Sequence, residues 1–416
     1  MFSNEIRLPL EKNLGDDLYR TLEGDILTEI LAEGKIEESS NYYQLILQGH
    51  SFKAMPRLSP GVSAIFEEVL GRLEFKEPIE FYINNSPELN AFAIASTEEG
   101  QPHIVNLNSG LLQMLSDQEL RFVVGHEIGH IISRNANISK LINFVYPNPA
   151  RIPVLLQHKI NLWQKLAELT ADRYGFIANP DMASCISGFF KISSGLNADR
   201  IGFDFNAYLE ENEHILARFR ETGAGSTLSH PINPIRIKAI QLFAASGLYK
   251  SLKENHQPVA DPALDEAIND LTMTLMVLSS SPLDQYRKQF IATAGIIMAN
   301  IDEQMTEEEY KLILNSLASF TIFPSEYLDT ILKAGEVGKQ LMEAISKILE
   351  INPADRYVMF DMMVSMVHTD RRISKPEIAF LFDIGTRMFG MNRREVAQLI
   401  AGNLQQGWNP ELYTQG

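Results

Sequence analysis

The sequence predicts an α+β fold in which a small β-sheet packs on helices and an all-helical region follows. Alternating apolar and polar residues, typical of strands, occur between residues 79 and 107, and stretches with helical apolar spacing lie on both sides of them. From about Pro258 onward the strand signals nearly vanish. The 416 residues suffice for two or three domains with sizeable hydrophobic cores.

Residues 1–55 are interpreted as a helical N-terminal extension. They are acidic, and Leu22, Ile26 and Ile30 recur at a near-helical spacing, but the segment carries no chemical signal. A further helix is expected after Ser59, because Pro60 suits a first helical turn.

Three strands and a long helix predict an α+β domain over residues 56–250. The strand candidates are residues 79–83, 91–94 and 103–107. Ser116 and Glu119 have the spacing of a capping box, so we expect a helix to begin there and to bury the apolar stripe that follows.

A polar stretch with two prolines, residues 253–262, predicts a linker to an all-helical C-terminal domain over residues 260–416. This region holds a weak internal repeat, in which Asp302 aligns with Asp370 at an offset of 68 residues. In each copy a hydroxyl residue precedes a glutamate by three positions, at 306–309 and 374–377, which predicts two capping boxes.

The repeated turn resembles that of the TerB-like helical domains of tellurite resistance. The resemblance covers short stretches only and implies a metal at Asp302 or Asp370. Ordinary structural roles, an aspartate in a turn and a glutamate in a cap, account for the same pattern. A protein partner for the C-terminal domain is a further expectation.

Composition excludes several classes of protein. The formal charge of -17 argues against a nucleic-acid or anionic-membrane surface, because an acidic field repels phosphate. Cys185 is the single cysteine and the first residues lack a secretory pattern, which together predict a cytoplasmic protein. The stretch nearest to a membrane span, residues 138–156, contains two basic residues and three prolines, so we interpret it as a loop or flap.

The most specific signal is His126-Glu-Ile-Gly-His130. On a helix the two histidines lie one turn apart on one face, where both imidazoles can bind one Zn²⁺ beside the carboxylate of Glu127. Alone, the motif could also be two histidines spaced so by chance.

A catalytic zinc needs a third protein ligand and an open position for water. The longer metzincin motif would place glycine at 133 and histidine at 136, but Ser133 and Ala136 stand there. Residues 163–175 predict a helix that ends at glycine, with Glu168 and Asp172 one turn apart. One of these carboxylates can bind the metal while the other accepts a hydrogen bond from a ligand histidine.

These motifs resemble the HtpX-like and CaaX prenyl protease-like family of zinc metallopeptidases. The resemblance rests on the histidine motif, on Glu168-x-x-Ala-Asp172, and on Ser229-His-Pro231 with Arg236 five residues beyond the proline. It extends upstream through residues 90–93 and 108–112, so it covers roughly residues 55–245.

The resemblance implies a mainly helical zincin-type metallopeptidase domain with one Zn²⁺ bound by His126, His130 and Glu168. It implies further that Glu127 is the general base, that His230 donates to the oxyanion, and that protein or peptide is the substrate. Arg236 would either stabilise the same site or brace Asp172.

Asn90 and the nearby strand resemble the family's substrate-flanking region, where a peptide can add to a sheet edge. An ordinary turn residue and an ordinary strand fit that stretch of sequence nearly as well.

Two functions follow as expectations. One is a soluble zinc endopeptidase, because the ligand, base and oxyanion residues are all present whereas no membrane span is visible. The alternative is a non-catalytic or latent scaffold whose C-terminal helices bind a partner. In a latent enzyme, residues 138–157 or the N-terminal helices would cover the cleft.

Overall fold

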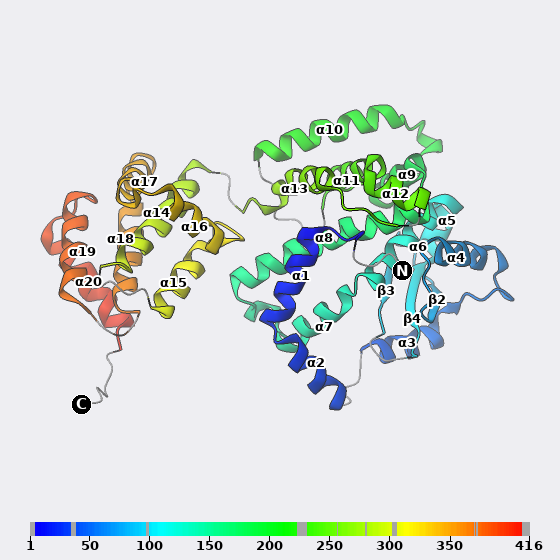
Figure 1. The fold of residues 1–416 in the computed structure, drawn as a ribbon, viewed down its shortest axis with the longest axis horizontal. Coiled ribbons are helices and arrows are strands. Elements are labelled where there is room, and N and C mark those ends of the chain that lie inside the picture. Colours follow the sequence, from blue (N-terminus) through cyan, green and yellow to red (C-terminus); the bar gives the residue numbers. More distant parts are fainter. Residues whose placement is uncertain are drawn as a thin grey trace. The chain divides into compact units, whose positions relative to one another are not determined.

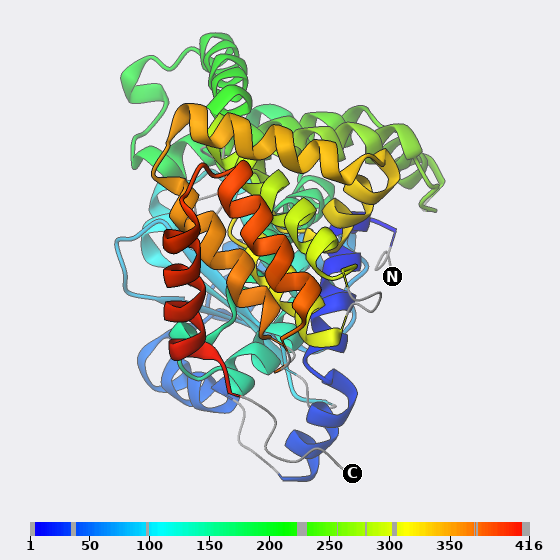
Figure 2. The same cartoon turned by 90° about the vertical axis from the view of Figure 1, so that its left-hand side faces the viewer.

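The structure is a computed structural model that describes residues 5–34, 39–96, 100–222, 231–255, 257–278, 281–301, 306–369, 371 and 373–409. Its contacts divide the chain into two compact units, residues 1–275 (unit 1) and 276–416 (unit 2). Unit 1 contains helices and one small sheet, and the described part of unit 2 contains helices alone (Figures 1 and 2). The predicted α+β class is therefore confirmed.

The sheet of unit 1 has four strands in the order β1-β2-β4-β3. The strands are β1 (Phe52–Lys53), β2 (Ile79–Asn84), β3 (Ala91–Ile94) and β4 (His103–Asn108). Strands β2 and β4 are parallel, and the other two pairs are antiparallel. All six residues of β4 are buried, whereas β3 forms an edge. The three predicted strands are thus confirmed.

Helices make up most of unit 1. Before and within the sheet they are α1 (Pro9–Thr21), α2 (Gly24–Glu33), α3 (Ser39–His50) and α4 (Pro60–Arg72). After it come α5 (Ser109–Met114), α6 (Asp117–Ile132), α7 (Asn135–Val145), α8 (Val154–Ala178), α9 (Met182–Ser194), α10 (Phe205–Thr222), α11 (Asn233–Ala245), α12 (Gly247–Asn255) and α13 (Pro262–Met276). The short 3-10 helices η1 (Pro149–Arg151) and η2 (Asp199–Ile201) lie in connections.

The backbones of α6 and α8 lie so close together that the glycine positions at their contact leave no room for a side chain larger than that of glycine. Gly125 and Gly129 of α6 face Ala178 and Tyr174 of α8, and Gly175 of α8 faces Phe122 of α6. A Cβ atom added at any of these glycines would collide with the opposite helix. The glycines therefore bring the backbones of the two helices together.

Two local predictions were wrong. Gly175 does not end its helix, because α8 continues to Ala178 and the glycine instead makes room for Phe122. The stretch 138–156 is not a plain loop, since α7 extends to Val145 and α8 already begins at Val154.

No helix among the described residues is both long and apolar enough to cross a membrane.

Unit 2 contains α14 (Pro282–Met298), α15 (Glu307–Leu317), α16 (Pro324–Ala334), α17 (Val337–Ile351), α18 (Asp355–Val367), α19 (Lys375–Arg387) and α20 (Arg393–Gly407). Their apolar faces form one core. The 68-residue offset brings α14, α15 and α16 into register with α18, α19 and α20, so the repeat is a three-helix motif. Both predicted capping boxes are present, at the starts of α15 and α19. Asp302 and Asp370 lie outside the described residues.

The division between the units falls after residue 275, whereas the sequence places the start of the C-terminal domain at residue 260. Asp261 gives a physical reason, because its carboxylate accepts the backbone N–H groups of Gly247 at 2.7 Å and Leu264 at 3.1 Å. It thereby joins the first turns of α12 and α13 and keeps α13 with unit 1.

Candidate metal centre

Helix α6, which carries the histidine motif, is fixed at its start. Glu119 Oε2 accepts the backbone N–H of Ser116 at 2.7 Å, and Ser116 Oγ accepts that of Glu119 at 3.4 Å, so the predicted capping box is confirmed. Lys191 of α9 donates to the same Glu119 oxygen at 2.8 Å. Most of the helix beyond this cap is buried. The two histidines therefore sit on a rigid element.

His126, His130 and Glu168 converge at one point. The Nε2 atoms of the two imidazoles are 3.2 Å apart. The Glu168 carboxylate lies 3.4 Å from Nε2 of His130 and 3.6 Å from Nε2 of His126. Ligand atoms on a tetrahedral zinc are separated by about 3.3 Å, given bonds of about 2.0–2.1 Å. These three residues therefore fit one zinc ion, and among the described residues they form a group able to hold a metal.

Asp172 orients the first of these histidines. Its Oδ1 lies 2.9 Å from Nδ1 of His126, so an Nδ1–H can donate to the carboxylate and leave the Nε2 lone pair for a metal. The spacing of Glu168 and Asp172 left their roles open. In the folded chain Glu168 faces both Nε2 atoms, while Asp172 lies behind His126.

Arg236 of α11 completes this network. It donates to Asp172 through Nε at 2.8 Å and through Nη2 at 2.6 Å, and its Nη2 lies 3.7 Å from Glu168. Its guanidinium also lies 4.6 Å from the ring centre of Phe189 in α9. Of the two predicted roles, the contacts match bracing of Asp172. Phe189 cannot be singled out from the sequence, because an aromatic residue in an amphipathic helix usually belongs to the core.

The electrostatics of the site follow from burial and close charges. Burial raises the pKa of Glu127 above its usual value, although His126 and His130 act in the opposite direction. Burial alone would also raise the pKa of Glu168, but the hydrogen bond from His130 and the charges of His126 and Arg236 hold it well below its usual value. Glu168 is thus an anion, as a zinc ligand must be, while Glu127 is suited to take up a proton.

Two predicted site residues are less defined. Asn90 directly precedes the edge strand β3, and its side-chain Oδ1 accepts the backbone N–H of Ala91 at 3.0 Å. His230 lies outside the described residues.

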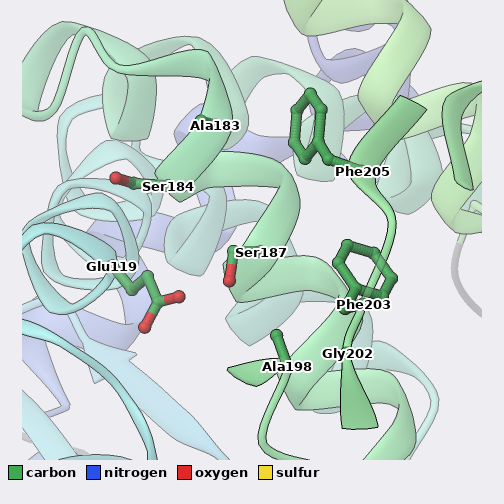
Figure 3. Close-up of a pocket in the computed structure, with 8 residues that line it drawn as sticks. All are labelled: Glu119, Ala183, Ser184, Ser187, Ala198, Gly202, Phe203 and Phe205. Carbon is green, nitrogen blue, oxygen red and sulfur yellow. The ribbon is translucent and has the colours of Figure 1, made fainter. Parts of the chain in front are cut away.

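A separate cavity lies beside the first turn of α6 (Figure 3). Its volume is about 560 Å³, and it is lined by Glu119, Ala183, Ser184, Ser187, Ala198, Gly202, Phe203 and Phe205. Glu119 precedes His126 by seven residues, which is about 10 Å along a helix. The cavity is therefore distinct from the metal centre.

Comparison with known proteins agrees with this geometry. Residues 56–243 match the model of peptidase family M48. The chain is similar to the chloroplastic plastoglobule-localized metallopeptidase 48 of Arabidopsis thaliana, with 27% identity over 190 residues that make up 42% of this chain and 55% of the relative. It is also similar to protease HtpX of Baumannia cicadellinicola subsp. Homalodisca coagulata, with 26% identity over 194 residues, 42% of this chain and 62% of the relative.

A protease HtpX homolog of Streptococcus uberis is 45% identical over 60 residues, which are 14% of this chain and 20% of the relative. The chain spans about half the length of the first two relatives and a smaller part of the third. The family resemblance that the sequence predicts is confirmed, and the TerB-like resemblance of the C-terminal region stays a prediction.

Proposed function

We propose, from the premise that residues 56–243 of this chain belong to peptidase family M48, that the protein is a zinc-dependent endopeptidase acting on protein or peptide substrates. The observation that carries this proposal is the mutual spacing of the His126, His130 and Glu168 ligand atoms, 3.2 to 3.6 Å. That spacing suits tetrahedral zinc with a fourth position left for water.

The residues of the chain divide the chemistry among them. When bound, zinc lowers the pKa of its water toward neutrality and polarises the scissile carbonyl. Glu127 takes the proton from the attacking water and delivers it to the leaving amine, for which its burial-raised pKa is suited. Asp172 and Arg236 keep His126 in the required orientation and tautomer.

The remaining roles come from the family resemblance. His230 donates a hydrogen bond to the oxyanion of the tetrahedral intermediate. Asn90 and strand β3 flank the substrate, and β3 is an edge strand that packs beside α6. A cytoplasmic location and a protein partner for unit 2 stay predictions from the sequence.

The competing proposal is a non-catalytic or latent scaffold whose unit 2 binds a partner. The all-helical unit 2, outside the family match, supports it. Latency through α1 is not favoured, because α1 and the residues just before it contact the side of α8 that faces away from Glu168. Coverage by residues 138–157 stays a prediction.

The test is metal analysis coupled to a peptide-library digest of the native protein and of Glu127→Gln. We expect one zinc per chain in both, and a loss of cleavage in the variant of at least about 100-fold, since the general base is removed. Glu309→Gln, at a buried glutamate of a capping box in unit 2, is the matched control and should cleave normally.

Full cleavage by Glu127→Gln would contradict the assigned mechanism. A native protein that holds zinc but cuts no peptide in the library would favour the scaffold, and a protein without affinity for zinc would overturn both the cofactor and the reaction.

A further inference from the structure

The N-terminal helix α1 packs against α8, the helix that carries Glu168, although α1 precedes the family match by more than 30 residues. Figure 1 shows α1, in dark blue, beside α8 and α7. Four apolar residues in α1 or just before it are buried: Ile6, Leu8, Leu14 and Leu18. Such burial is not expected of an extension that merely precedes a domain.

The contacts lie on the back of α8. Successive helical residues turn by about 100°, so Thr170 and Arg173 lie about 200° and 140° around the helix from Glu168, and Trp163 lies about 220° from it. These residues face α1 or the segment before it. Glu168 and the residues that contact the N-terminal segment therefore lie on opposite faces of α8.

A buried polar network joins the segment to α8. The backbone N–H of Leu8 donates to Thr170 Oγ1 at 3.2 Å, and the hydroxyl of Thr170 lies 3.5 Å from Glu11 Oε2. Glu11 is completely buried, and Arg7 donates to both of its carboxylate oxygens, at 2.9 and 2.8 Å. Because each buried group is costly without its partner, this network fixes the register of α1 on α8.

Arg173 adds a second connection beside the site. Arg173 is 2% exposed, and its guanidinium donates through Nη1 to the carbonyl of Ile6 at 2.9 Å and lies 5.2 Å from the ring centre of Phe243 in α11. Burial lowers the pKa of Arg173 to about 10. Arg173 directly follows Asp172, whose partner Arg236 is also on α11. Two successive residues of α8, Asp172 and Arg173, thus connect this helix to α11, and Arg173 also connects it to the N-terminal segment.

Apolar packing closes the interface. A Cβ atom on Gly15 of α1 would lie 3.2 Å from both Ile138 of α7 and the indole nitrogen of Trp163 in α8. Helix α1 therefore occupies the space between α7, which directly follows the histidine-bearing helix, and α8. Lys159 and Asp17 form an ion pair at 2.6 Å further along the same interface.

We infer that residues 5–21 are a positioning element of the metal centre, so that the metal-binding unit of this chain begins near residue 5 rather than at residue 56. Arg7, Glu11, Thr170 and Arg173 are its positioning residues, acting on Glu168 through the placement of α8. A ligand set tolerates displacements of only about 0.5 Å, so a helix that carries one ligand needs support on its far side. This inference rests on the zinc site of the proposed function.

The test compares Leu18→Asp in α1 with Leu47→Asp in α3. Both residues are buried in helices before the matched region, but α3 packs on β1 and β2 rather than on α8. The zinc dissociation constant of each full-length variant is measured by competition with a chromogenic chelator, at a temperature where circular dichroism shows both folded. We expect zinc affinity to fall at least about 100-fold for Leu18→Asp, because a buried aspartate expels α1, and less than about threefold for Leu47→Asp.

A second measurement uses the unmodified protein and is decisive if Leu18→Asp does not fold. Coupling between two sites is reciprocal, so zinc should slow amide hydrogen exchange in residues 8–18 by about tenfold or more and leave residues 45–50 unchanged. Wild-type affinity in Leu18→Asp, equal losses in both variants, or no zinc-dependent protection of residues 8–18 would each overturn the inference. Neither readout requires cleavage, so a protein that binds zinc in this way without peptidase activity would refute the proposed function alone.

Discussion

Units 1 and 2 differ in where their buried charged residues lie within the helices. Unit 1 has buried acids near helix starts, Glu11 and Glu119, but it also has buried charged residues in the middle of helices, namely Glu127, Lys165, Asp172 and Arg173. The buried acids of unit 2 among the described residues are Glu309 and Glu377, which cap helices, and Asp355, which pairs with Arg287 at a helix start.

This difference in position distinguishes charges that stabilise the fold from charges that form a functional site. Charge at a helix start satisfies backbone N–H groups and stabilises the fold by itself. Charge in the middle of a packed helix is costly unless it is fully paired, so its concentration around α6 and α8 indicates a site rather than a scaffold. Unit 2, with a repeated three-helix motif and an apolar core, carries no comparable cluster in its described residues.

The largest expected effect comes from breaking one acid–arginine pair in each unit. Asp172→Asn removes the charge that opposes buried Arg236, and we expect unit 1 to lose about 3–5 kcal/mol of its free energy of unfolding and about 10–100-fold in zinc affinity. Asp355→Asn breaks the pair with Arg287, whose side chain is 34% exposed, and should cost about 1 kcal/mol. Urea unfolding followed by hydrogen exchange separates the two units. Equal losses would remove the distinction between them.

Metal removal should affect one unit only. A ligand that binds the folded state at 100 times its dissociation constant stabilises it by about 2.7 kcal/mol. Chelation of zinc is therefore expected to lower the unfolding temperature of unit 1 and to leave that of unit 2 unchanged, as measured by calorimetry. A shift in the transition of unit 2 would indicate a second metal there, as the TerB-like resemblance implies.

How much of the fold and of the candidate metal centre can be predicted from the sequence depends on how far apart in the chain the interacting residues lie. The capping box at Ser116, the placement of His126 and His130 one turn apart on a helix, and the three strands depend on local spacing, and the structure confirms these predictions. The spacing of Glu168 and Asp172 showed that both share a face, but not which of them faces the Nε2 atoms, because that depends on how α8 packs against α6.

The N-terminal segment shows the same limit. Its apolar spacing predicts a buried face but not the surface that covers this face, so the sequence alone places α1 in an N-terminal extension. Likewise, the sequence pattern predicts a helix end at Gly175, because it does not reveal the close approach of Phe122. Long-range packing decides both outcomes.

Replacing one crowded glycine of unit 1 and one open glycine of unit 2 by alanine should change the stability of the two units in opposite directions. A methyl group at Gly125 would collide with Ala178 of α8 and lie 3.1 Å from the Cα of Gly175, so Gly125→Ala should destabilise unit 1 by about 1–3 kcal/mol and weaken zinc binding by separating the ligand helices. Gly402 lies inside α20 with no heavy atom within 4 Å of the added group. Gly402→Ala should therefore stabilise unit 2, by about 0.5–1 kcal/mol. Thermal unfolding of each variant, with zinc titration of the first, checks both signs; a neutral Gly125→Ala would show that α6 and α8 can move apart freely.

The smallest expected effect is a loss of stability on removal of a helix cap, and it should be the same in both units. Ser116→Ala and Ser374→Ala each remove a capping-box hydroxyl, one at the start of the histidine-bearing α6 and the other at the start of α19. Each should cost about 1 kcal/mol, because an N-cap acts on the first turn of its own helix. His126 and His130 lie ten or more residues beyond Ser116, so zinc affinity in Ser116→Ala should match that of Ser374→Ala in a chelator competition. A weaker affinity in Ser116→Ala alone would mean that the end of α6 transmits strain to the metal centre, and that unit 1 differs from unit 2 even in its helix caps.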